Sequence, residues 1–553
     1  MPLTLHGLVA SHAAERPDSA ALHDDRRDLT WGAWQASALR LAACLHDSGV
    51  RPGDSVAVFC AKAAELPVSM TAVSMLGARF LAGSAVWPDA ASERISGIVG
   101  RCFVLALPEA PSFWTVHPVI RLDPGAVFEG DAREPASAPA ADPDADVYLN
   151  VTSASTGMPM IACATHGNLI ANTRGVCRTL GLDSSDVHMS LFSSTSHPHE
   201  IFARGILLGG ASVLTECRYP REALQLIGRH GVTALMGLPP QLEGLARICS
   251  REDADISSLK LVEAGGMHFS NEFAELFGSL AGIDATAVWG STETTGVVLA
   301  GDPGREGFTR VVEGYRVELR DADGAVVEEG EGEMWVSGEA VVSRYAGDRA
   351  STEAGFVNGW FRTGDVFRRE DGCLHFVGRV GGLIKSAGLK VHPLEVELAL
   401  LRHPGIADAA VAGEDHPSRG ETVSAWVTTR PGAVVSPQEL RRFLRGRLED
   451  YKIPRTFHFV DDLPKTPAGK IDRTALGRAP AGADPRADIL RTDIELVRLL
   501  NHRRQTMSRM EQSYDGNWLE EQLSSAAGHN PGPLSDDTVR EILAFIIDMM
   551  TRR

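Results

Sequence analysis

The chain has 553 residues, which at roughly 150 residues per domain corresponds to three or four domains and excludes a single small module. With 44% hydrophobic and 23% charged residues, 55 Gly and 30 Pro, the composition is that of a globular protein and excludes disordered, collagen-like and low-complexity classes. Lys and Arg number 54 against 72 Asp and Glu, so the formal charge of -18 disfavours nucleic acid and anionic membranes as partners, and local groups must hold any anionic ligand.

Neither the cysteines nor the N-terminal segment points to an oxidising compartment or to a membrane. The eight cysteines form no C-x-x-C pair, a pattern typical of reduced thiols. The first residues lack a basic segment followed by an apolar run, and no stretch of about 18 uncharged apolar residues occurs. We therefore predict a soluble, cytoplasmic protein without a membrane partner.

In chain order, the first three quarters alternate short β-branched runs with amphipathic Ala/Leu-rich stretches. This alternation predicts βα units on largely parallel sheets, hence an α/β fold. The predicted strands lie at residues 55–62, 211–216 and 232–239, and the predicted helices at 63–78 and 221–231.

From about residue 310 the pattern changes to short strands separated by Gly and Asp turns. The sequences DADG at 321–324 and EDGC at 370–373 are typical of hairpin turns, and they predict an antiparallel section.

Two boundaries follow. Gly381 and Gly382 stand between two predicted strands, where adjacent glycines fit either a hinge or an ordinary tight turn. A Pro, Ala and Gly linker, APAGADP, occupies 479–485, and the remaining residues have helical periodicity. The predicted domains are a large N-terminal domain (1–380), a small one (381–478), the linker (479–485) and a helical tail (486–553). The tail is expected to pack on a second copy of itself or on the body.

A strand at 148–152 runs into the sequence TSASTG, which is rich in hydroxyl groups. Backbone N–H groups and hydroxyls in such a loop can surround an anion, although a merely polar turn has the same composition. The candidate anion-binding residues are Thr152, Ser153, Ser155, Thr156 and Gly157.

Five further segments occur in a characteristic order: GGM at 265–267, WGSTETTG at 289–296, WFRTGD at 360–365, GRVGGLIKSAGLKVHPLEVE at 378–397 and LPKTPAGKIDR at 463–473. With the TSASTG loop they resemble the adenylate-forming superfamily, which includes acyl-CoA synthetases, peptide-synthetase adenylation domains and luciferases. The resemblance covers roughly residues 5–478. It implies a large N-terminal part with βα sheets and a small β-barrel, joined by a hinge to a small α/β lid.

The resemblance implies ATP and Mg²⁺ as cofactors and assigns catalytic roles. Thr292 and Glu293 match the pair that contacts the adenylate phosphate and magnesium, for which a carboxylate is a suitable hard ligand. Asp365 resembles the acid that binds the ribose hydroxyls, and Arg379 the arginine that assists it. Lys470 matches the mobile lysine that stabilises charge between the acid oxygen and the α-phosphorus.

Other positions are implied to bind the nucleotide. Gly265 and Gly266 would let the backbone approach the adenine face, and Trp289 stands where an aromatic residue commonly stacks on that ring. Gly290 and Ser291 belong to the same nucleotide-binding segment. Taken singly, each residue also has an ordinary structural interpretation.

Three positions depart from the family pattern. Ala154 replaces a glycine of the phosphate loop, and Met160 replaces a lysine, which should reduce but not abolish adenylation. Gly381 stands at the hinge where the family usually has Asp or Lys, so the thioester-forming half reaction is less certain to be retained than the first.

The stretch at 189–210 lacks the Asp that amino-acid-activating relatives use to hold a substrate ammonium, which disfavours an amino acid. By the resemblance, His197, His199, Phe202 and Met267 line the acid pocket. The segment SHPHEIF also admits a metal site, although it lacks a third ligand pattern. Residues 389–397 are closer to aryl-CoA ligases, so we expect an aromatic acid.

The helical tail resembles the small chorismate mutase family, which forms intertwined dimers. Arg486 and Arg503 coincide with two substrate-binding arginines, whereas Tyr514, Trp518 and Ala544 replace other polar groups of that family. Because a dicarboxylate needs several cations in one pocket, we interpret the tail as a catalytically silent dimerisation or docking module.

The predicted function is ATP-dependent activation of a hydroxy- or aminobenzoate-type acid as acyl-adenylate. The acyl group would then pass to CoA, a separate carrier protein or a second small molecule with an amine or hydroxyl. The alternative is a degenerate adenylation fold that serves as a scaffold or regulatory partner.

Overall fold

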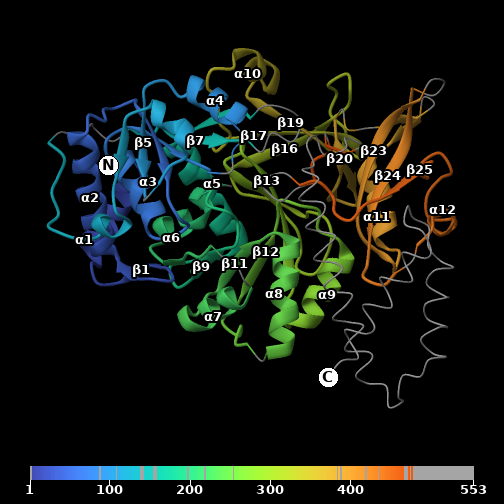
Figure 1. Cartoon of the computed structure of the whole chain (residues 1–553), viewed down its shortest axis with the longest axis horizontal. Helices are drawn as coiled ribbons and strands as arrows, with labels where there is room; N and C mark the ends of the chain where they lie inside the picture. The colour runs from blue at the N-terminus through green and yellow to red at the C-terminus, as the bar shows by residue number, and fades with distance from the viewer. Residues whose placement is uncertain are drawn as a thin grey trace, which may run out of the picture. The chain divides into compact units, whose positions relative to one another are not determined.

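The structure is a computed structural model, and Figure 1 shows its elements. It describes residues 3–85, 87, 89–107, 109–136, 142–152, 159–195, 198–216, 220–252, 254–380, 382, 384–386, 389–416, 420–433, 435–465, 471–473 and 475–476. The chain divides into two units, Met1–Leu476 and Gly477–Arg553, and all described residues belong to the first. The predicted linker and chorismate mutase-like tail lie outside the described residues.

A nine-stranded sheet runs through the middle of the first unit in the order β15-β14-β13-β12-β11-β9-β10-β1-β2. Its strands from β13 to β1 are parallel, and antiparallel strands close both edges. The bounds are β1 (Ala20–His23), β2 (Asp28–Thr30), β9 (Val187–Ser190), β10 (Ala211–Val213), β11 (Ala234–Gly237), β12 (Leu261–Ala264), β13 (Ala285–Ser291), β14 (Gly296–Ala300) and β15 (Arg310–Val311).

A six-stranded sheet has the order β6-β5-β3-β4-β7-β8 and is parallel except for the β7–β8 pair. The bounds are β3 (Ser55–Phe59), β4 (Arg79–Ala82), β5 (Cys102–Ala106), β6 (Val119–Arg121), β7 (Asp146–Val151) and β8 (Ile161–Thr165). The predicted strands at 55–62, 211–216 and 232–239 are confirmed as β3, β10 and β11.

Helices cover both sheets. They are α1 (Leu5–Glu15), α2 (Trp31–Asp47), α3 (Glu65–Met75), α4 (Asp89–Ile98), α5 (His166–Leu180), α6 (Ala203–Leu208), α7 (Pro220–His230), α8 (Pro239–Glu252) and α9 (Asn271–Ala281), with short 3₁₀ turns η1 (Ser112–Val116), η2 (Pro124–Val127) and η3 (Pro198–Ile201). Helix α10 (Arg349–Gly355) lies instead beside the antiparallel section that follows residue 310. Local signals set their ends: Thr165 and Asn168 form a capping box at the start of α5, and Gly181 ends that helix in the left-handed conformation.

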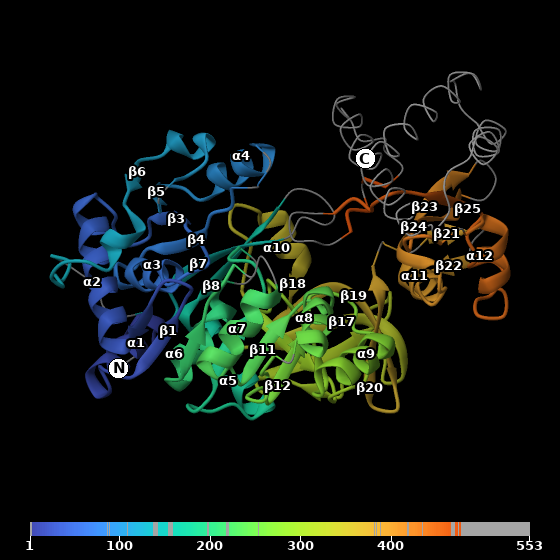
Figure 2. The same ribbon diagram turned by 60° about the horizontal axis from the view of Figure 1, so that its bottom comes forward.

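Packing follows the layers expected of βα units. Side chains of α1, α2, α3, α5 and α6 fill one core against both sheets, and α7, α8 and α9 form a second core on the nine-stranded sheet (Figure 2). The predicted helices at 63–78 and 221–231 are confirmed as α3 and α7.

The section after residue 310 is antiparallel, as predicted. It forms a five-stranded sheet of β16 (Tyr315–Arg320), β17 (Gly330–Gly338), β18 (Phe356–Val357), β19 (Trp360–Glu370) and β20 (Cys373–Arg379). The DADG turn joins β16 to β17 and the EDGC turn joins β19 to β20, so both predicted hairpins are confirmed.

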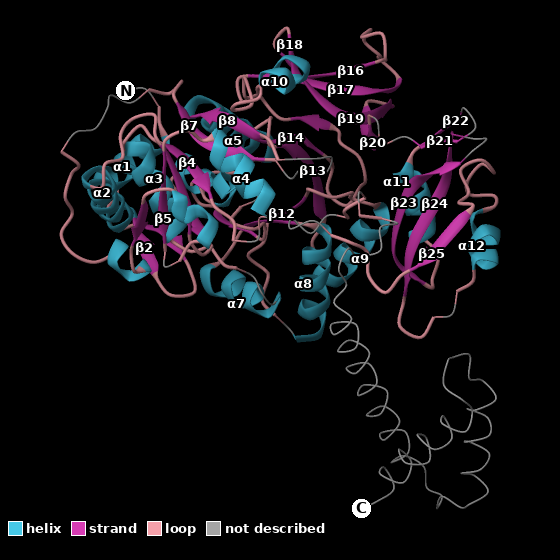
Figure 3. Cartoon of the chain, turned by 45° about the horizontal axis from the view of Figure 1, so that its top comes forward, coloured by secondary structure: helices cyan, strands magenta, loops and turns pink. Residues whose placement is uncertain are grey.

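The last described segment is a smaller α/β layer pair (Figure 3). Its sheet contains β21 (Ile384–Ser386), β22 (Leu389–Val391), β23 (Ile406–His416), β24 (Gly420–Thr429) and β25 (Thr456–Phe459), and α11 (Pro393–Leu401) and α12 (Pro437–Leu444) share its core. The strands that were predicted to flank Gly381 are β20 and β21, while Gly381 itself is outside the described residues.

Candidate active site

The motif residues of the large domain gather where parallel strands end. Gly265, Gly266 and Met267 directly follow β12, and residues 292–295 form the turn between β13 and β14. In open α/β sheets ligands bind at the carboxyl ends of the strands, so this edge is the expected position of a site.

The 292–295 turn has a constrained backbone. Thr295 has a φ of 62°, an uncommon value for a residue with a branched side chain. The Ser291 N–H donates to Thr294 Oγ1 over 2.9 Å, which closes the turn. A Cβ at Gly290 would lie 2.2 Å from the Gly296 carbonyl oxygen, so the tight hairpin requires glycine there.

Glu293 is held from outside its own hairpin. The Tyr345 hydroxyl donates to Glu293 Oε1 over 2.7 Å, and the Val342 N–H donates to the Glu293 carbonyl over 2.9 Å. Burial, and secondly the Glu293 carboxylate, raise the pKa of Tyr345, so its hydroxyl remains a donor at neutral pH. The part-exposed carboxylate of Glu293 and hydroxyl of Thr292 are hard oxygen donors, the chemistry that Mg²⁺ prefers.

Buried side chains hold the rest of the turn. His199 Nε2 lies 2.7 Å from the Thr295 carbonyl oxygen, and burial lowers the pKa of His199 to about 4, so the neutral ring donates this bond. The Tyr315 hydroxyl donates to the Thr294 carbonyl, and Asn172 Nδ2 donates to the Tyr315 hydroxyl over 2.8 Å.

His199 was expected to line the acid pocket. The structure places it fully buried beneath the Thr-Glu turn, with its ring 5.5 Å from that of Tyr148. Among the described residues, neither His199 nor Glu200 belongs to a cluster of three metal-ligating groups, and His197 is outside those residues.

Asp365 and Arg379 face each other across two strands. Asp365 on β19 is directly opposite Arg379 on β20, and Arg379 Nε donates to Asp365 Oδ1 over 2.8 Å. From β13, Trp289 Nε1 donates to Asp365 Oδ2 over 3.1 Å. Only 5% of Asp365 is exposed, so these two donors fix a desolvated carboxylate in one orientation.

Trp289 therefore has a contact that the sequence did not predict. Its ring meets Phe367 edge to face, with ring centres 5.7 Å apart. Stacking of Trp289 on adenine stays a prediction.

The residues predicted around the acid occupy different environments. Gly266 has a φ of 74°, which favours glycine, and Met267 beside it is 38% exposed. Phe202 is 1% exposed in the core, with its ring 6.5 Å from that of Trp34. The structure thus brings Met267 to the open edge of the site and Phe202 into the hydrophobic interior.

The phosphate loop is described only at its two ends. The Thr152 N–H donates to the Met160 carbonyl over 2.9 Å, and the Met160 N–H donates to Thr152 Oγ1 over 3.0 Å. The Met160 side chain packs against the core, and Arg94 Nε donates to the Pro159 carbonyl over 3.0 Å. Ser153, Ser155, Thr156, Gly157 and Ala154 lie outside the described residues.

In the smaller layer pair, Arg473 Nη2 lies 2.7 Å from both carboxylate oxygens of Glu397, and the Val411 N–H donates to Glu397 Oε1 over 2.8 Å. Glu397 is 4% exposed, and burial raises its pKa despite the lowering effect of Arg473. Lys470, three positions before Arg473, is outside the described residues.

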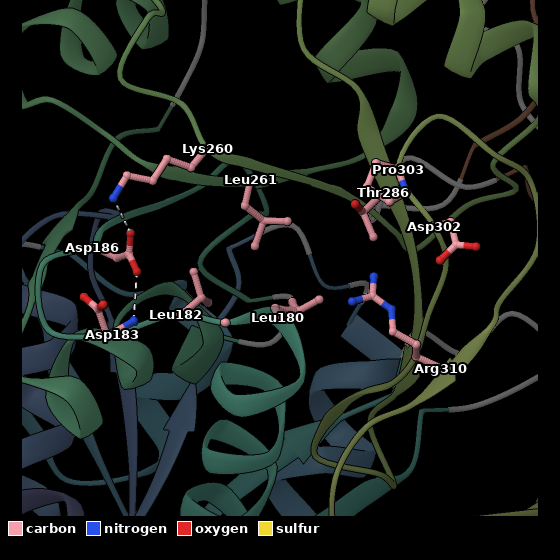
Figure 4. A pocket seen from close by; sticks show the side chains of 11 residues that line it. Leu180, Leu182, Asp183, Asp186, Lys260, Leu261, Thr286, Asp302, Pro303 and Arg310 are labelled. Carbon is pink, nitrogen blue, oxygen red and sulfur yellow. Dashed lines mark hydrogen bonds and ion pairs between the residues drawn. The ribbon is translucent and has the colours of Figure 1, made fainter.

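A separate pocket opens at the opposite ends of the strands (Figure 4). It is lined by the segments that lead into β9 and β12, by Thr286 near the start of β13, and by the segment that joins β14 to β15, with Lys260 Nζ 3.6 Å from Asp186 Oδ1. It contains none of the motif residues, and its position at the amino ends of parallel strands is unusual for an active site.

Sequence reasoning missed Tyr345, Asn172 and Tyr315. Tyr345 and Tyr315 contact the turn directly, and Asn172 supports it through the Tyr315 hydroxyl. None of the three lies in a segment with a recognisable spacing. Glu397 ends a motif segment but carried no assigned role.

Comparison with known proteins agrees with this geometry. The AMP-binding enzyme family matches residues 9–346, and the AMP-binding enzyme C-terminal domain matches residues 395–470. The chain belongs to the AMP-binding enzyme family. It is an AMP-forming acid ligase in class, with the fold of the adenylate-forming enzymes.

Its relatives include a feruloyl-CoA synthase from Amycolatopsis sp, 30% identical over 82% of this chain and 94% of the relative. A salicyl-AMP ligase / salicyl-S-ArCP synthetase from Mycobacterium tuberculosis is 30% identical over 85% of this chain and 90% of the relative. The solved structure of o-succinylbenzoate coenzyme A synthetase from Bacillus subtilis with ATP and magnesium has a TM-score of 0.78 and 25% identity, covering 85% of this chain and 98% of that chain. No helix among the described residues has the length and apolar character needed to span a membrane.

Proposed function

We propose that this chain activates an aromatic carboxylic acid with ATP to give an acyl-adenylate and pyrophosphate. The carboxylate oxygen of the acid bonds to the α-phosphorus of ATP, and the bond from that phosphorus to the bridging oxygen breaks as pyrophosphate leaves with the electron pair. The observation that carries this proposal is the fixed pair of acidic groups, Glu293 held by Tyr345 and Asp365 held by Arg379 and Trp289.

Each acidic group has a role that its surroundings support. Asp365 would accept hydrogen bonds from the ribose hydroxyls, because each carboxylate oxygen retains acceptor capacity beyond one protein donor. Glu293 would hold Mg²⁺, which when bound neutralises charge on the phosphate oxygens, and the Thr292 hydroxyl would donate to a phosphate oxygen. Lys470 would stabilise the charge that develops as pyrophosphate leaves.

An aromatic substrate is supported by three observations. The stretch at 189–210 contains no Asp to pair with a substrate ammonium. Met267 presents an exposed, adaptable apolar side chain at the site edge. The relatives include enzymes named for ferulate and salicylate, and a structure named as anthranilate CoA ligase shares the fold with a TM-score of 0.78 at 24% identity.

For the second half reaction we propose attack of a thiol, amine or hydroxyl on the acyl carbon, with AMP as the leaving group. CoA and carrier protein are the acceptors named in the relatives' titles. A second small molecule remains the third candidate from the sequence.

Acid-dependent exchange of labelled pyrophosphate into ATP tests the first half reaction. A panel of benzoate, hydroxybenzoates, aminobenzoates, cinnamates, octanoate and amino acids should give exchange with at least one aromatic acid. Lys470→Ala and Glu293→Gln should each reduce that exchange at least a hundredfold. Exchange with octanoate alone would contradict the aromatic assignment, whereas no exchange with any acid would favour the scaffold alternative.

We also propose that the helical tail forms a homodimer. Removal of residues 479–553 should then convert the dimer to a monomer, with the mass measured by light scattering equal to that of one truncated chain. A mass of two truncated chains would exclude this role for the tail. Turnover of chorismate by the full chain at the rate of a free mutase would overturn the interpretation of the tail as silent.

A further inference from the structure

Three side chains with metal-ligating atoms lie close together at the β1–β2 edge of the nine-stranded sheet, several strands away from the motif residues at β12 and β13. They are His23, at the end of β1, Asp28, at the start of β2, and His230, the last residue of α7. One ligand atom from each lies within 4.8 Å of the other two. Among the described residues this is the one group of three or more His, Cys, Asp or Glu side chains with that geometry.

The backbone places these residues together for ordinary reasons. His23 and Asp28 are directly opposite in the antiparallel β1–β2 pair. Strand β1 also pairs in parallel with β10, and α7 follows β10 after a short connection, so the end of α7 returns beside the hairpin. Two of the ligands are thus fixed by strand register, and the third by the helix that covers the same sheet.

Two of the three side chains are already joined by a hydrogen bond, and the two imidazole rings are in contact. His23 Nδ1 lies 2.7 Å from Asp28 Oδ1. The His23 and His230 rings are 4.3 Å apart between centres and inclined by 30°. His230 Nε2 is buried and has no hydrogen-bond partner among the described residues. A buried ring nitrogen without a partner is costly, and a metal ion is one of the few species that would satisfy it.

Its charge state also suits a cation. Burial, and secondly the neighbouring His23, lower the pKa of His230, so its ring is neutral and its lone pair is available at neutral pH. The hydrogen bond from His23 lowers the pKa of Asp28, which is therefore ionised. Two imidazole nitrogens and one carboxylate oxygen form a donor set that suits Zn²⁺ and similar borderline divalent metals better than it suits Mg²⁺.

We propose that His23, Asp28 and His230 form a binding site for Zn²⁺ or a similar transition-metal ion, separate from the adenylating centre. Zn–N and Zn–O bonds of about 2.0–2.2 Å place neighbouring ligand atoms roughly 3.5 Å apart. His23 Nδ1 and Asp28 Oδ1, now 2.7 Å apart, would therefore separate slightly, and His230 would move closer to them by a side-chain rotation. The metal takes the position of the proton between His23 Nδ1 and Asp28 Oδ1, and that proton moves through solvent to Nε2 of the same ring, which stays a neutral imidazole. Water completes the coordination.

The site has a structural consequence. Strand β2 is the last strand of the nine-stranded sheet, and an edge strand is the part of a sheet with fewest partners. A bound ion ties the β1–β2 hairpin to α7, and it stabilises the folded state by an amount that grows with the logarithm of the ratio of ion concentration to dissociation constant.

The test measures binding of Zn²⁺ alone to metal-free protein in a buffer that contains millimolar Mg²⁺, by isothermal titration calorimetry and competition with a chromophoric chelator. The full chain should bind one equivalent with micromolar or better affinity, and saturation should raise the apparent Tm by on the order of 2 °C. His23→Ala and His230→Gln should each weaken this equivalent at least tenfold.

Two further variants separate the proposed site from other surface histidines. His458→Gln removes a histidine that, among the described residues, is paired with one carboxylate, that of Glu414 at 3.3 Å. This variant should still bind one equivalent of Zn²⁺ with wild-type affinity. Arg229→Gln removes a cation that acts on both Asp28 and His230, and should tighten binding. Unchanged Zn²⁺ affinity in His23→Ala and His230→Gln, with both variants folded by circular dichroism, would overturn the proposal. Pyrophosphate exchange in His230→Gln should equal wild type, so this outcome is independent of the proposed function.

Discussion

The hydroxyl of Tyr345 and the carboxylate of Glu293, 52 positions apart in the chain, are joined by a 2.7 Å hydrogen bond. Tyr345 thus fixes the orientation of the side chain that is proposed to hold magnesium. Its own ring is held by packing against Phe356, with ring centres 5.4 Å apart.

Tyr345→Phe should therefore reduce acid-dependent pyrophosphate exchange about tenfold and raise the Mg²⁺ concentration for half-maximal rate. A hydrogen bond to a charged group contributes about 1.5–3 kcal/mol, and each 1.4 kcal/mol corresponds to a factor of ten. The rate of pyrophosphate exchange measured as a function of MgCl₂ concentration checks this prediction. Tyr451→Phe, which changes an exposed tyrosine, is the control. An unchanged Mg²⁺ dependence would show that Tyr345 has only a packing role.

Trp289→Phe tests the second donor to Asp365. The variant keeps an aromatic ring against Phe367 but loses the indole N–H, so we expect the KM for ATP to rise about three- to tenfold with little change in kcat. Trp335→Phe is the matched control, because the indole nitrogen of Trp335 has no partner among the described residues. A loss of kcat without a change in KM would instead assign Trp289 to the chemical step.

Arg473→Met should make stability more sensitive to pH. Burial raises the pKa of Glu397, so the protonated form is favoured in the fold, and stability from this group declines as pH rises from the unfolded value, about 4.3, through the raised folded value. Without Arg473 the folded pKa rises further, and the decline extends to higher pH.

Scanning calorimetry of Arg473→Met should accordingly show a larger drop in apparent Tm between pH 5 and pH 8 than wild type shows. The added change Glu397→Gln should remove the difference, since a neutral amide does not titrate. If the apparent Tm of Arg473→Met and of wild type changed with pH by the same amount, Arg473 would not be the group that limits the rise in the pKa of Glu397.

Glu200→Gln offers a second test of pH dependence. Burial is the largest influence on this group and raises the pKa of Glu200 from 4.5 to about 7. Ionisation of Glu200 in the fold is thus unfavourable, and wild type loses stability between about pH 4.5 and about pH 7. The variant lacks this loss, so its advantage should grow across that interval to about 3 kcal/mol and then stay constant. The free energy of unfolding of both proteins, measured with denaturant at pH 5 and pH 8, checks that the stability advantage of Glu200→Gln is larger at pH 8.

Met160→Lys restores the cation that the phosphate loop lacks. A lysine stem can follow the apolar path of Met160 while its ammonium reaches solvent, so the KM for ATP should fall about three- to tenfold. Met160→Leu should leave the KM unchanged. An equal KM in all three proteins would show that the missing lysine has no consequence for ATP binding.

Much of the fold follows from local pattern. The change from two-residue to helical periodicity predicts strand β3 and helix α3. The DADG and EDGC turns predict the antiparallel sheet. The ordered motifs predicted roles for Thr292 and Glu293, and the structure adds that both lie in the turn between β13 and β14. The same order of motifs predicts Phe202 at the acid pocket, and the structure places its ring beside that of Trp34. The order of motifs indicates which segment comes near the site, but it does not indicate which side chains of that segment point toward it.

The sequence by itself determined the family and the order of the elements, since these depend on neighbours in the chain, and it predicted which acidic groups bind the nucleotide and magnesium. Only the tertiary structure decided that Tyr345 meets Glu293, that His199 supports the Thr295 carbonyl instead of facing the acid, and that Glu397 lies against Arg473. Such contacts join residues dozens of positions apart, and they form because parallel sheets and their covering helices bury polar groups that must then find partners across the fold.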